Sequence, residues 1–144
     1  MFLKNEKADF KNRIVKVKEN DKAKFGKMNV NQMVCHCADQ FRMLFGEIKG
    51  LKRENVNLRE MRAKIQRNET VKTVDGLDQV SGEGTKPKDF EEDKKILISY
   101  IDKFSQCAND YKFSFHPYMG EITGDQWESL VIHHLKHHLS QFGR

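Results

Sequence analysis

The feature that most constrains the fold is the spacing of apolar residues, which recur every three or four positions in several separate segments. Such spacing matches the helical repeat of about 3.6 residues per turn and predicts amphipathic helices with one apolar side. The clearest stripe begins at Val30 and continues through Val34, Cys37, Phe41, Leu44 and Ile48. Similar patterns predict helices over 6–20, from Asp89 to about Cys107, and after Thr123.

Capping residues in the sequence also indicate where helices begin. Asn29 is followed three residues later by Gln32, and Thr123 by Gln126, so both pairs fit a capping box. Asp89 precedes three acidic residues at 91–93, which suit the positive end of a helix dipole. These signals predict helix starts near residues 30, 90 and 124.

Residues 51–88 lack sustained apolar periodicity and end in a Gly- and Pro-containing run at 80–87, typical of loops. This segment leaves room for a short helix near 56–66. The chain has no internal repeat and no strand pattern long enough to build a sheet. We therefore predict an all-α fold, a four-helix bundle with a long crossover between its second and third helices, as a single domain over 1–144.

Composition and cysteine content indicate the compartment in which such a fold would work. The chain has 144 residues, 38% apolar and 33% charged, enough to bury a core beneath a heavily solvated surface. No stretch approaches the roughly 18 apolar residues of a membrane span, and Met1 is followed closely by Lys4 without a signal-peptide apolar region. Three cysteines, an odd count, do not suggest a disulfide framework. We expect a cytoplasmic protein without a membrane partner.

The formal net charge of +5 raises the question of nucleic-acid binding. Residues 1–28 contain nine basic and four acidic residues, so the whole excess lies there. No aromatic-interleaved patch, zinc finger or phosphate-binding glycine loop accompanies this segment. A solvated basic face is therefore favoured over a nucleic-acid interface.

The last expected helix contains four histidines in two pairs with i, i+4 spacing, His133 with His137 and His134 with His138. At about 100° per residue, the apolar stripe that begins at Trp127 continues through His134 and His138, which should point inward. His133 and His137 fall to one side, towards solvent or a groove wall.

Burying two imidazoles without partners costs about 1–3 kcal/mol each, and a shared metal ion would offset this cost. Neutral imidazole binds zinc, nickel, copper and iron, and i, i+4 spacing lets two rings converge. Two hydrogen-bonded core histidines remain an equal alternative for the pair taken alone.

A third ligand must come from another helix. His36 is the only histidine in the second helix, roughly 120° from the centre of its apolar stripe, which predicts a site near the bundle's edge. Three protein ligands leave coordination positions for water or substrate. Cys35 and Cys37 flank His36 but point about 100° to either side of it, so we interpret Cys37 as core and Cys35 as a small outer-face residue.

Two segments together resemble the DinB/YfiT-like superfamily of metalloenzymes, and within it a branch of uncharacterised proteins. The first runs from Phe25 to Met33 and into Cys35-His36, and the second carries His116-Pro117-Tyr118-Met119-Gly120, Trp127 and the run 134–143, HLKHHLSQFG. The likeness extends in order over nearly the whole chain. A tryptophan common in that branch is replaced here by Phe25, a change that should spare the metal.

The resemblance implies that His36, His134 and His138 bind a divalent cation, typically zinc or nickel. Other members include transferases that use low-molecular-weight thiols such as bacillithiol or mycothiol, and isomerases dependent on such a thiol. Members often pair through helix faces, which makes a homodimer one expectation for this chain.

These expectations combine into a functional hypothesis: a metal-dependent enzyme that activates a bound thiol or water for attack on an electrophile. The thiol S-transferase is the preferred version, with a small-molecule thiol or electrophile as partner. His116, Tyr118 and His137 could shape the pocket mouth, while Gln40 and Gln141 could orient ligands. The rival is a non-catalytic metal-binding or stress-related protein of the same fold.

Overall fold

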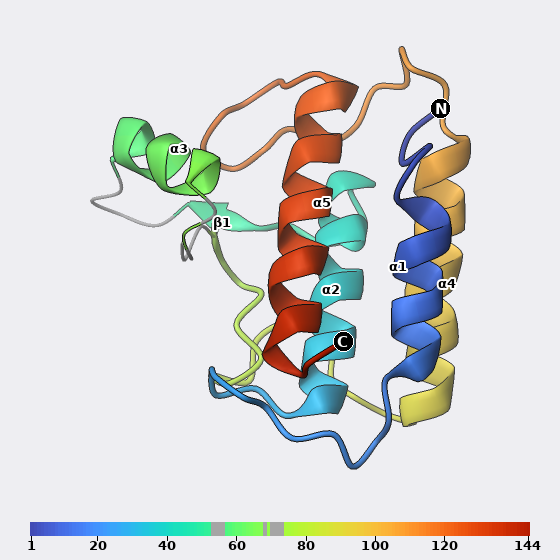
Figure 1. Cartoon of the computed structure of the whole chain (residues 1–144). Helices are drawn as coiled ribbons and strands as arrows, with labels where there is room; N and C mark the ends of the chain where they lie inside the picture. The colour runs from blue at the N-terminus through green and yellow to red at the C-terminus, as the bar shows by residue number, and fades with distance from the viewer. Residues whose placement is uncertain (53–56, 68, 70–73) are drawn as a thin grey trace.

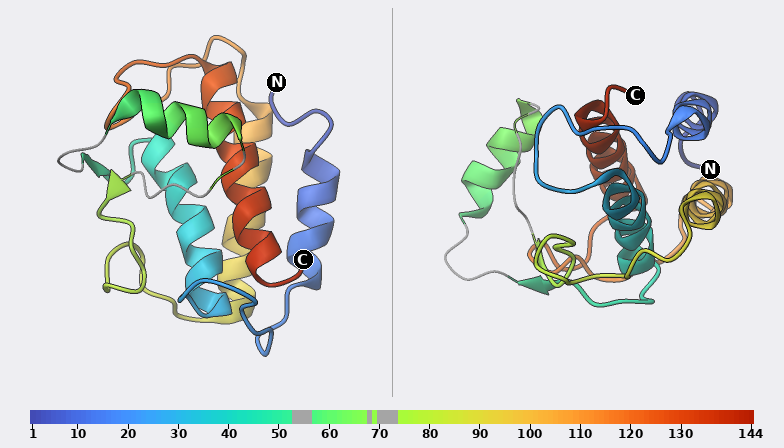
Figure 2. Two further views of the ribbon diagram at one scale, coloured as in Figure 1. Left: turned by 60° about the vertical axis from the view of Figure 1, so that its left-hand side comes forward. Right: turned by 90° about the horizontal axis from the view of Figure 1, so that it is seen from below.

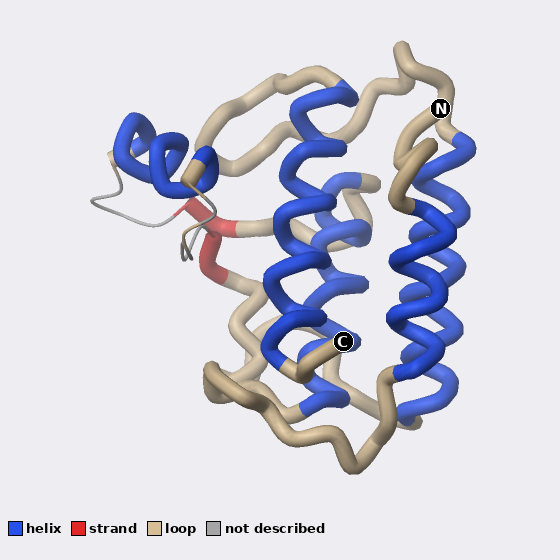
Figure 3. Tube along the Cα trace, in the orientation of Figure 1, coloured by secondary structure: helices blue, strands red, loops and turns tan. Residues whose placement is uncertain are grey.

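The structure, a computed structural model, describes residues 1–52, 57–67, 69 and 74–144 and is mostly helical there. Its helices in this part of the chain are α1 (Lys7–Lys16), α2 (Val30–Leu44), α3 (Leu58–Gln66), α4 (Phe90–Gln106) and α5 (Gly124–Gln141). Two short strands, β1 (Leu51–Lys52) and β2 (Val74–Asp75), pair antiparallel, with Leu51 opposite Asp75 (Figure 3). The prediction of a mainly helical chain is confirmed.

The four longer helices pack side by side. α2 contacts α4 and α5, and α1 also contacts α4 and α5. In Figure 1, α3 and β1 lie on the side of α2 and α5 that faces away from α1 and α4, and the view from below in Figure 2 agrees. α2 and α5 therefore have one side turned to the other long helices and another turned to the crossover.

The core fills the space between the four longer helices. α5 contributes Trp127, Val131, Leu135 and Leu139, one every four residues, and each is at most 1% exposed. Fully buried side chains from the other three helices complete the core, including Phe10, Ile14, Phe41, Leu44, Leu97, Ile101 and Phe104. This spacing buries one continuous stripe along each helix, as amphipathic helices require.

Both predicted capping boxes are present. The backbone N–H of Gln32 donates to Asn29 Oδ1 at 2.8 Å, and that of Gln126 donates to Thr123 Oγ1 at 3.1 Å. In each box the glutamine side chain accepts from the backbone of the capping residue. Asp89 caps α4 in the expected way by accepting from the Glu92 N–H. Side-chain oxygens thus satisfy backbone donors that the helix leaves free.

Helix ends and strands show where the sequence interpretation was wrong. α1 was expected to run to residue 20 but ends at Lys16, because Val17 adopts an extended conformation. α2 was expected to include Ile48 but ends at Leu44, shortly before Gly46, whose φ of +77° breaks the helix. The two strands were not expected at all. The short helix near 56–66 is present as α3, and no helix in the described part could span a membrane.

Candidate metal centre

Three histidines from two helices converge on the side of α2 and α5 that faces the crossover. The ring centroids of His36, His134 and His138 lie 4.5 to 4.8 Å apart. One ligand atom from each ring lies within 4.8 Å of the other two, and the Nε2 atoms of His36 and His134 are 3.0 Å apart. His36 and His134 are partly buried and His138 is buried, so the group could hold a metal ion.

Hydrogen bonds orient two of the three rings. The Leu77 carbonyl can only accept, so His36 Nδ1, 2.9 Å away, carries the proton and Nε2 keeps its lone pair. His138 Nδ1 lies 2.7 Å from Oε1 of Gln141 and is the donor of that bond by the same reasoning. Both rings therefore keep Nε2 unprotonated, and that of His36 faces Nε2 of His134 at 3.0 Å; such outer partners prepare histidine ligands.

The electrostatics keep these rings neutral. Burial lowers the pKa of His138 to about 3 and lowers the pKa of His36 below its usual value. Burial, together with the neighbouring imidazoles of His138 and His36, holds the pKa of His134 well below its usual range. Neutral imidazole is the form that binds metal, so the group is ready for a cation at neutral pH.

The donor set fits a divalent ion. His134 Nδ1 is buried and has no hydrogen-bond partner in the described part of the chain, while its Nε2 faces another imidazole nitrogen. Two zinc–nitrogen bonds of about 2.0–2.1 Å at a tetrahedral angle place the nitrogens roughly 3.4 Å apart, near the 3.0 Å between the Nε2 atoms of His36 and His134, while all ligand atoms of the group lie within 4.8 Å of one another. Without a cation, the Nε2–H of His134 can donate to Nε2 of His36; a cation would bind both nitrogens instead.

A buried carboxylate holds the loop that orients His36. Asp39 is fully buried in α2, and its oxygens accept from the Thr85 N–H at 2.8 Å and the Thr85 hydroxyl at 2.6 Å. Arg42 and Gln79 donate to the same carboxylate at 2.8 and 3.3 Å. The loop 77–85 is thereby fastened to the helix that carries His36.

Gly84, one of two glycines in this loop, explains how the loop comes so close to α2. Gly84 has a φ of +75°, and a Cβ there would lie 2.5 Å from Oδ2 of Asp39 and 2.9 Å from Nε2 of Gln79. Only glycine combines this left-handed backbone with this approach. The run containing Gly84 was interpreted from sequence only as a turn, and its part in the site was missed.

A second glycine supports His138 in a similar way. Gly26 has a φ of +84°, and a Cβ there would lie 2.6 Å from Nε2 of Gln141, the residue that orients His138. The Lys24 N–H also donates to the Gln141 carbonyl at 2.7 Å, which fixes the loop against the end of α5. Each oriented histidine therefore depends on a loop that approaches closely at a glycine.

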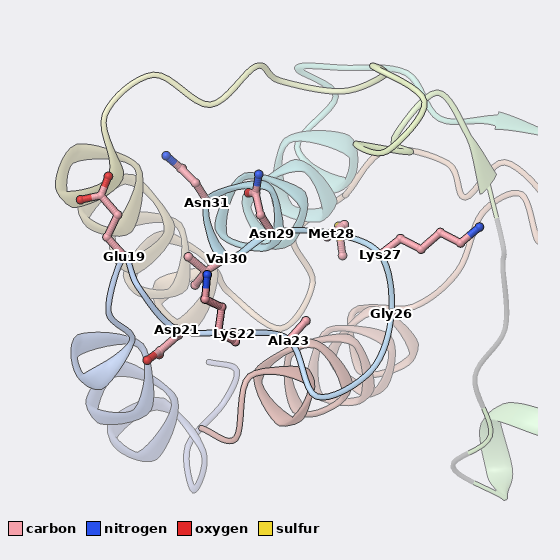
Figure 4. A pocket seen from close by; sticks show the side chains of 10 residues that line it. All are labelled: Glu19, Asp21, Lys22, Ala23, Gly26, Lys27, Met28, Asn29, Val30 and Asn31. Atoms are coloured by element: carbon pink, nitrogen blue, oxygen red, sulfur yellow. The ribbon is translucent and has the colours of Figure 1, made fainter.

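The loop that contains Gly26 also encloses a separate surface hollow of about 470 Å³ in front of the start of α2 (Figure 4). Its lining is largely polar or charged, with Glu19, Asp21, Lys22 and Asn29 among the residues. None of the histidines lines it. Because Asn29 already caps α2, this hollow offers no chemistry comparable to that of the histidine group.

A larger cavity, of about 510 Å³, opens directly beside the histidine group. All three histidines line it, together with four of the residues predicted from sequence to shape or support a pocket: Gln40, His116, His137 and Gln141. Tyr118, the fifth, is buried and is not among the lining residues. A cavity of this size falls within the range of small-molecule sites, about 300–1,000 Å³.

His116 has a structural task as well. Its Nδ1 accepts from the backbone N–H groups of Tyr118 and Met119, at 3.1 and 3.3 Å, and its ring lies 5.4 Å from that of Trp127. Gly120, with a φ of +67°, completes this turn through backbone bonds with residue 116. Burial lowers the pKa of His116 to about 4, so it is neutral at physiological pH.

Two details of the helix faces differ from expectation. Cys35 was placed on the outer face, but it is 2% exposed, and burial raises the pKa of its thiol to about 12. Cys37 is core, as predicted. His134 and His138 were expected on the α5 core stripe, whereas the stripe passes through Leu135 and Leu139 and the histidines flank it towards the cavity.

The fold and this site define a mostly helical protein with a three-histidine group that could hold a metal ion. The chain belongs to the family described as protein of unknown function (DUF1569), which it matches over residues 5–144. No curated protein and no solved structure matches it.

Proposed function

We propose that this chain is a divalent-metal-dependent enzyme of the DinB-like type, with His36, His134 and His138 as the metal ligands. The observation that carries the proposal is the convergence of three neutral imidazoles from two helices, with ligand atoms within 4.8 Å of one another. The side-by-side packing of α1, α2, α4 and α5 supports a four-helix bundle of that type, with 45–89 as the long crossover.

Zinc or nickel is the proposed ion, because imidazole nitrogen suits both metals. Three protein ligands leave at least one coordination position, as in catalytic sites, whereas structural zinc usually has four protein ligands. A divalent ion bound there lowers the pKa of a bound thiol or water and so supplies a nucleophile at neutral pH.

The protein's own residues prepare this chemistry. Leu77 and Gln141 hold the rings of His36 and His138 with Nε2 available. The cavity beside the rings gives a small molecule access to the site, and its lining surface is mostly apolar. The proposed reaction is attack of a low-molecular-weight thiolate on the electrophilic carbon of a molecule bound in this cavity: the S–C bond forms, the leaving group departs with its bonding electrons, and the thiol proton passes to solvent.

The first experiment is elemental analysis of the purified protein, made without a His tag, beside two variants. We expect about one zinc or nickel ion per chain, loss of the ion in His134→Ala, and retention in His133→Ala. The control is closely matched, because His133 is adjacent on α5 and lines the same cavity but lies outside the ligand group. Equal metal content in the two variants would refute the assigned ligands.

Turnover is tested separately. The metal-loaded protein is incubated with monochlorobimane and several cellular thiols, and fluorescent conjugate is measured against His134→Ala. We expect conjugation with at least one thiol and none with the variant. Full metal occupancy without conjugation of any thiol would instead favour a non-catalytic metal-binding protein of the same fold.

A further inference from the structure

Four methionines line the cavity beside the histidines. Met28 precedes α2, Met43 lies in α2, Met61 in α3 and Met119 before α5, and all four line the cavity. They are four of the chain's six methionines, gathered from four separate segments. Methionine is flexible and polarisable, adapts to varied shapes and makes favourable contacts with aromatic rings.

Further apolar side chains share this lining with the histidines and other polar residues. Val74, Leu77, Val80 and Leu130 line the cavity as well. The two lining residues with a full charge, Lys27 and Asp78, have opposite signs, so the lining carries no net charge from them. A substrate with several charges of one sign would therefore find no opposite net charge in this lining.

One side-chain oxygen in the cavity lining lacks a hydrogen-bond partner among the described residues. Gln40 lies one turn beyond His36 on α2 and is 9% exposed. Its Oε1 is buried without a hydrogen bond to any described residue. We expected Gln40 to orient a histidine ligand, but Leu77 and Gln141 perform that task.

An unpaired buried acceptor is unfavourable, and a ligand that donates a hydrogen bond to it gains affinity. Because Gln40 Oε1 only accepts, a hydroxyl or N–H group of a ligand can supply this bond. Its place one turn from His36 puts this contact beside the histidine group.

We propose that the cavity binds a small substrate with a compact apolar body, which packs against the methionines while a hydroxyl or N–H group of the substrate donates to Gln40 Oε1. As a substrate assignment this rests on the proposed metal-dependent function, but the binding of the apolar body does not require the metal. Apolar burial supplies the affinity, and Gln40 fixes which end of the molecule faces the histidines.

The test uses the full chain labelled with ¹³C at the methionine methyl groups, in metal-free and zinc-loaded forms. Two probes are titrated: phenylacetohydroxamate, which has an apolar ring, and acetohydroxamate, which shares its polar group but lacks the ring. Met28, Met43, Met61 and Met119 report on the cavity. Met33, fully buried in the core, and the exposed Met1 serve as internal controls.

We expect phenylacetohydroxamate to shift the methyl signals of the four cavity methionines and leave those of Met1 and Met33 in place. Burying a phenyl group predicts that it binds at least about tenfold more tightly than acetohydroxamate in both forms of the protein. Equal affinities of the two probes, or shifts spread evenly over all six methionines, would overturn the proposal. Selective shifts that zinc does not strengthen would support the apolar cavity and count against the metal-dependent function alone.

Two variants test the polar contact. Gln40→Leu should weaken phenylacetohydroxamate binding by about 3- to 10-fold, the size of one hydrogen bond, without changing zinc affinity. Gln106→Leu, which makes the same change at an exposed position on α4, should leave both affinities as they are. An unchanged probe affinity in Gln40→Leu would remove Gln40 from the proposal.

Discussion

The two sides of α2 and α5 bury different kinds of side chain, one apolar and the other polar. The side turned to α1 and α4 carries side chains such as Phe41 and Leu135 that are fully buried among apolar neighbours. The side turned to the crossover carries His36, Gln40 and His138, which are also largely enclosed but polar. Burial on the first side stabilises the fold, whereas burial on the second opposes it and is maintained by specific hydrogen bonds.

This difference determines how each side tolerates change. Apolar packing depends mainly on volume and shape, so its losses should appear in the free energy of unfolding. The cavity side depends on individual hydrogen bonds, such as those that His36 and His138 donate to Leu77 and Gln141. Substitutions on this side should therefore chiefly lower the metal affinity. The predictions below test this division.

The largest effect on stability is expected from Phe104→Ala on the core side. Phe104 is fully buried, and its ring stacks on that of Phe2 with centroids 4.9 Å apart. Removing the ring should lower the free energy of unfolding by about 3–5 kcal/mol, as measured by urea denaturation. The exposed Phe115 provides the control, and Phe115→Ala should stay within about 0.5 kcal/mol. If the folded Phe104→Ala protein binds zinc less tightly than the parent, the two sides are not separable.

Asp39→Asn should affect both quantities, because Asp39 is fully buried and its carboxylate holds the loop that orients His36. An asparagine would turn an NH₂ group towards donors from Thr85, Arg42 or Gln79, at a cost of about 2–3 kcal/mol in stability. Zinc affinity, measured by competition with a chromogenic chelator, should fall about 10- to 100-fold as the loop that orients His36 loosens. Asp110→Asn, an exposed counterpart, should change neither. A stability loss with unchanged zinc affinity would show that the loop does not hold His36.

The core side of these helices can be predicted from the sequence more fully than the cavity side. The core helices follow from apolar spacing, and Asn29 and Thr123 mark helix starts, because these signals are local in the chain. The pairing of His134 with His138 is local too. The approach of His36 could be proposed from the same patterns, but the Leu77 carbonyl and the Asp39 anchor could not, because they depend on how residues 77–85 return to α2. A buried aspartate in the middle of an apolar helix was the one available signal.

Lowering the pH should reduce the free energy of unfolding through His116, which lines the cavity. Burial lowers its pKa from the usual 6.5 to about 4, so the folded protein binds fewer protons than the unfolded chain between these values. His116 therefore costs stability as the pH falls below about 6.5, by up to ~1.4 kcal/mol per pH unit until about pH 4. His116→Asn keeps an acceptor for the turn but does not titrate, so its unfolding free energy should depend less steeply on pH over this range. An unchanged slope in urea denaturation from pH 7 to pH 4 would mean that His116 is protonated in the folded state.

The finest test compares two glycines that share a backbone conformation. Gly26 and Gly82 have φ values of +84° and +82°, but a Cβ at Gly26 would meet Gln141, whereas one at Gly82 would meet nothing within 4 Å. Alanine at either position should cost about 1–2 kcal/mol of stability through the left-handed backbone. Only Gly26→Ala should also displace Gln141 from His138 and weaken zinc binding, by a smaller factor than Asp39→Asn does. Because the backbone penalty is common to both variants, their difference in chelator-measured zinc affinity isolates the contact with Gln141. Equal zinc affinities would mean that the loop can move without disturbing the histidine, and that the support of His138 lies within α5 alone.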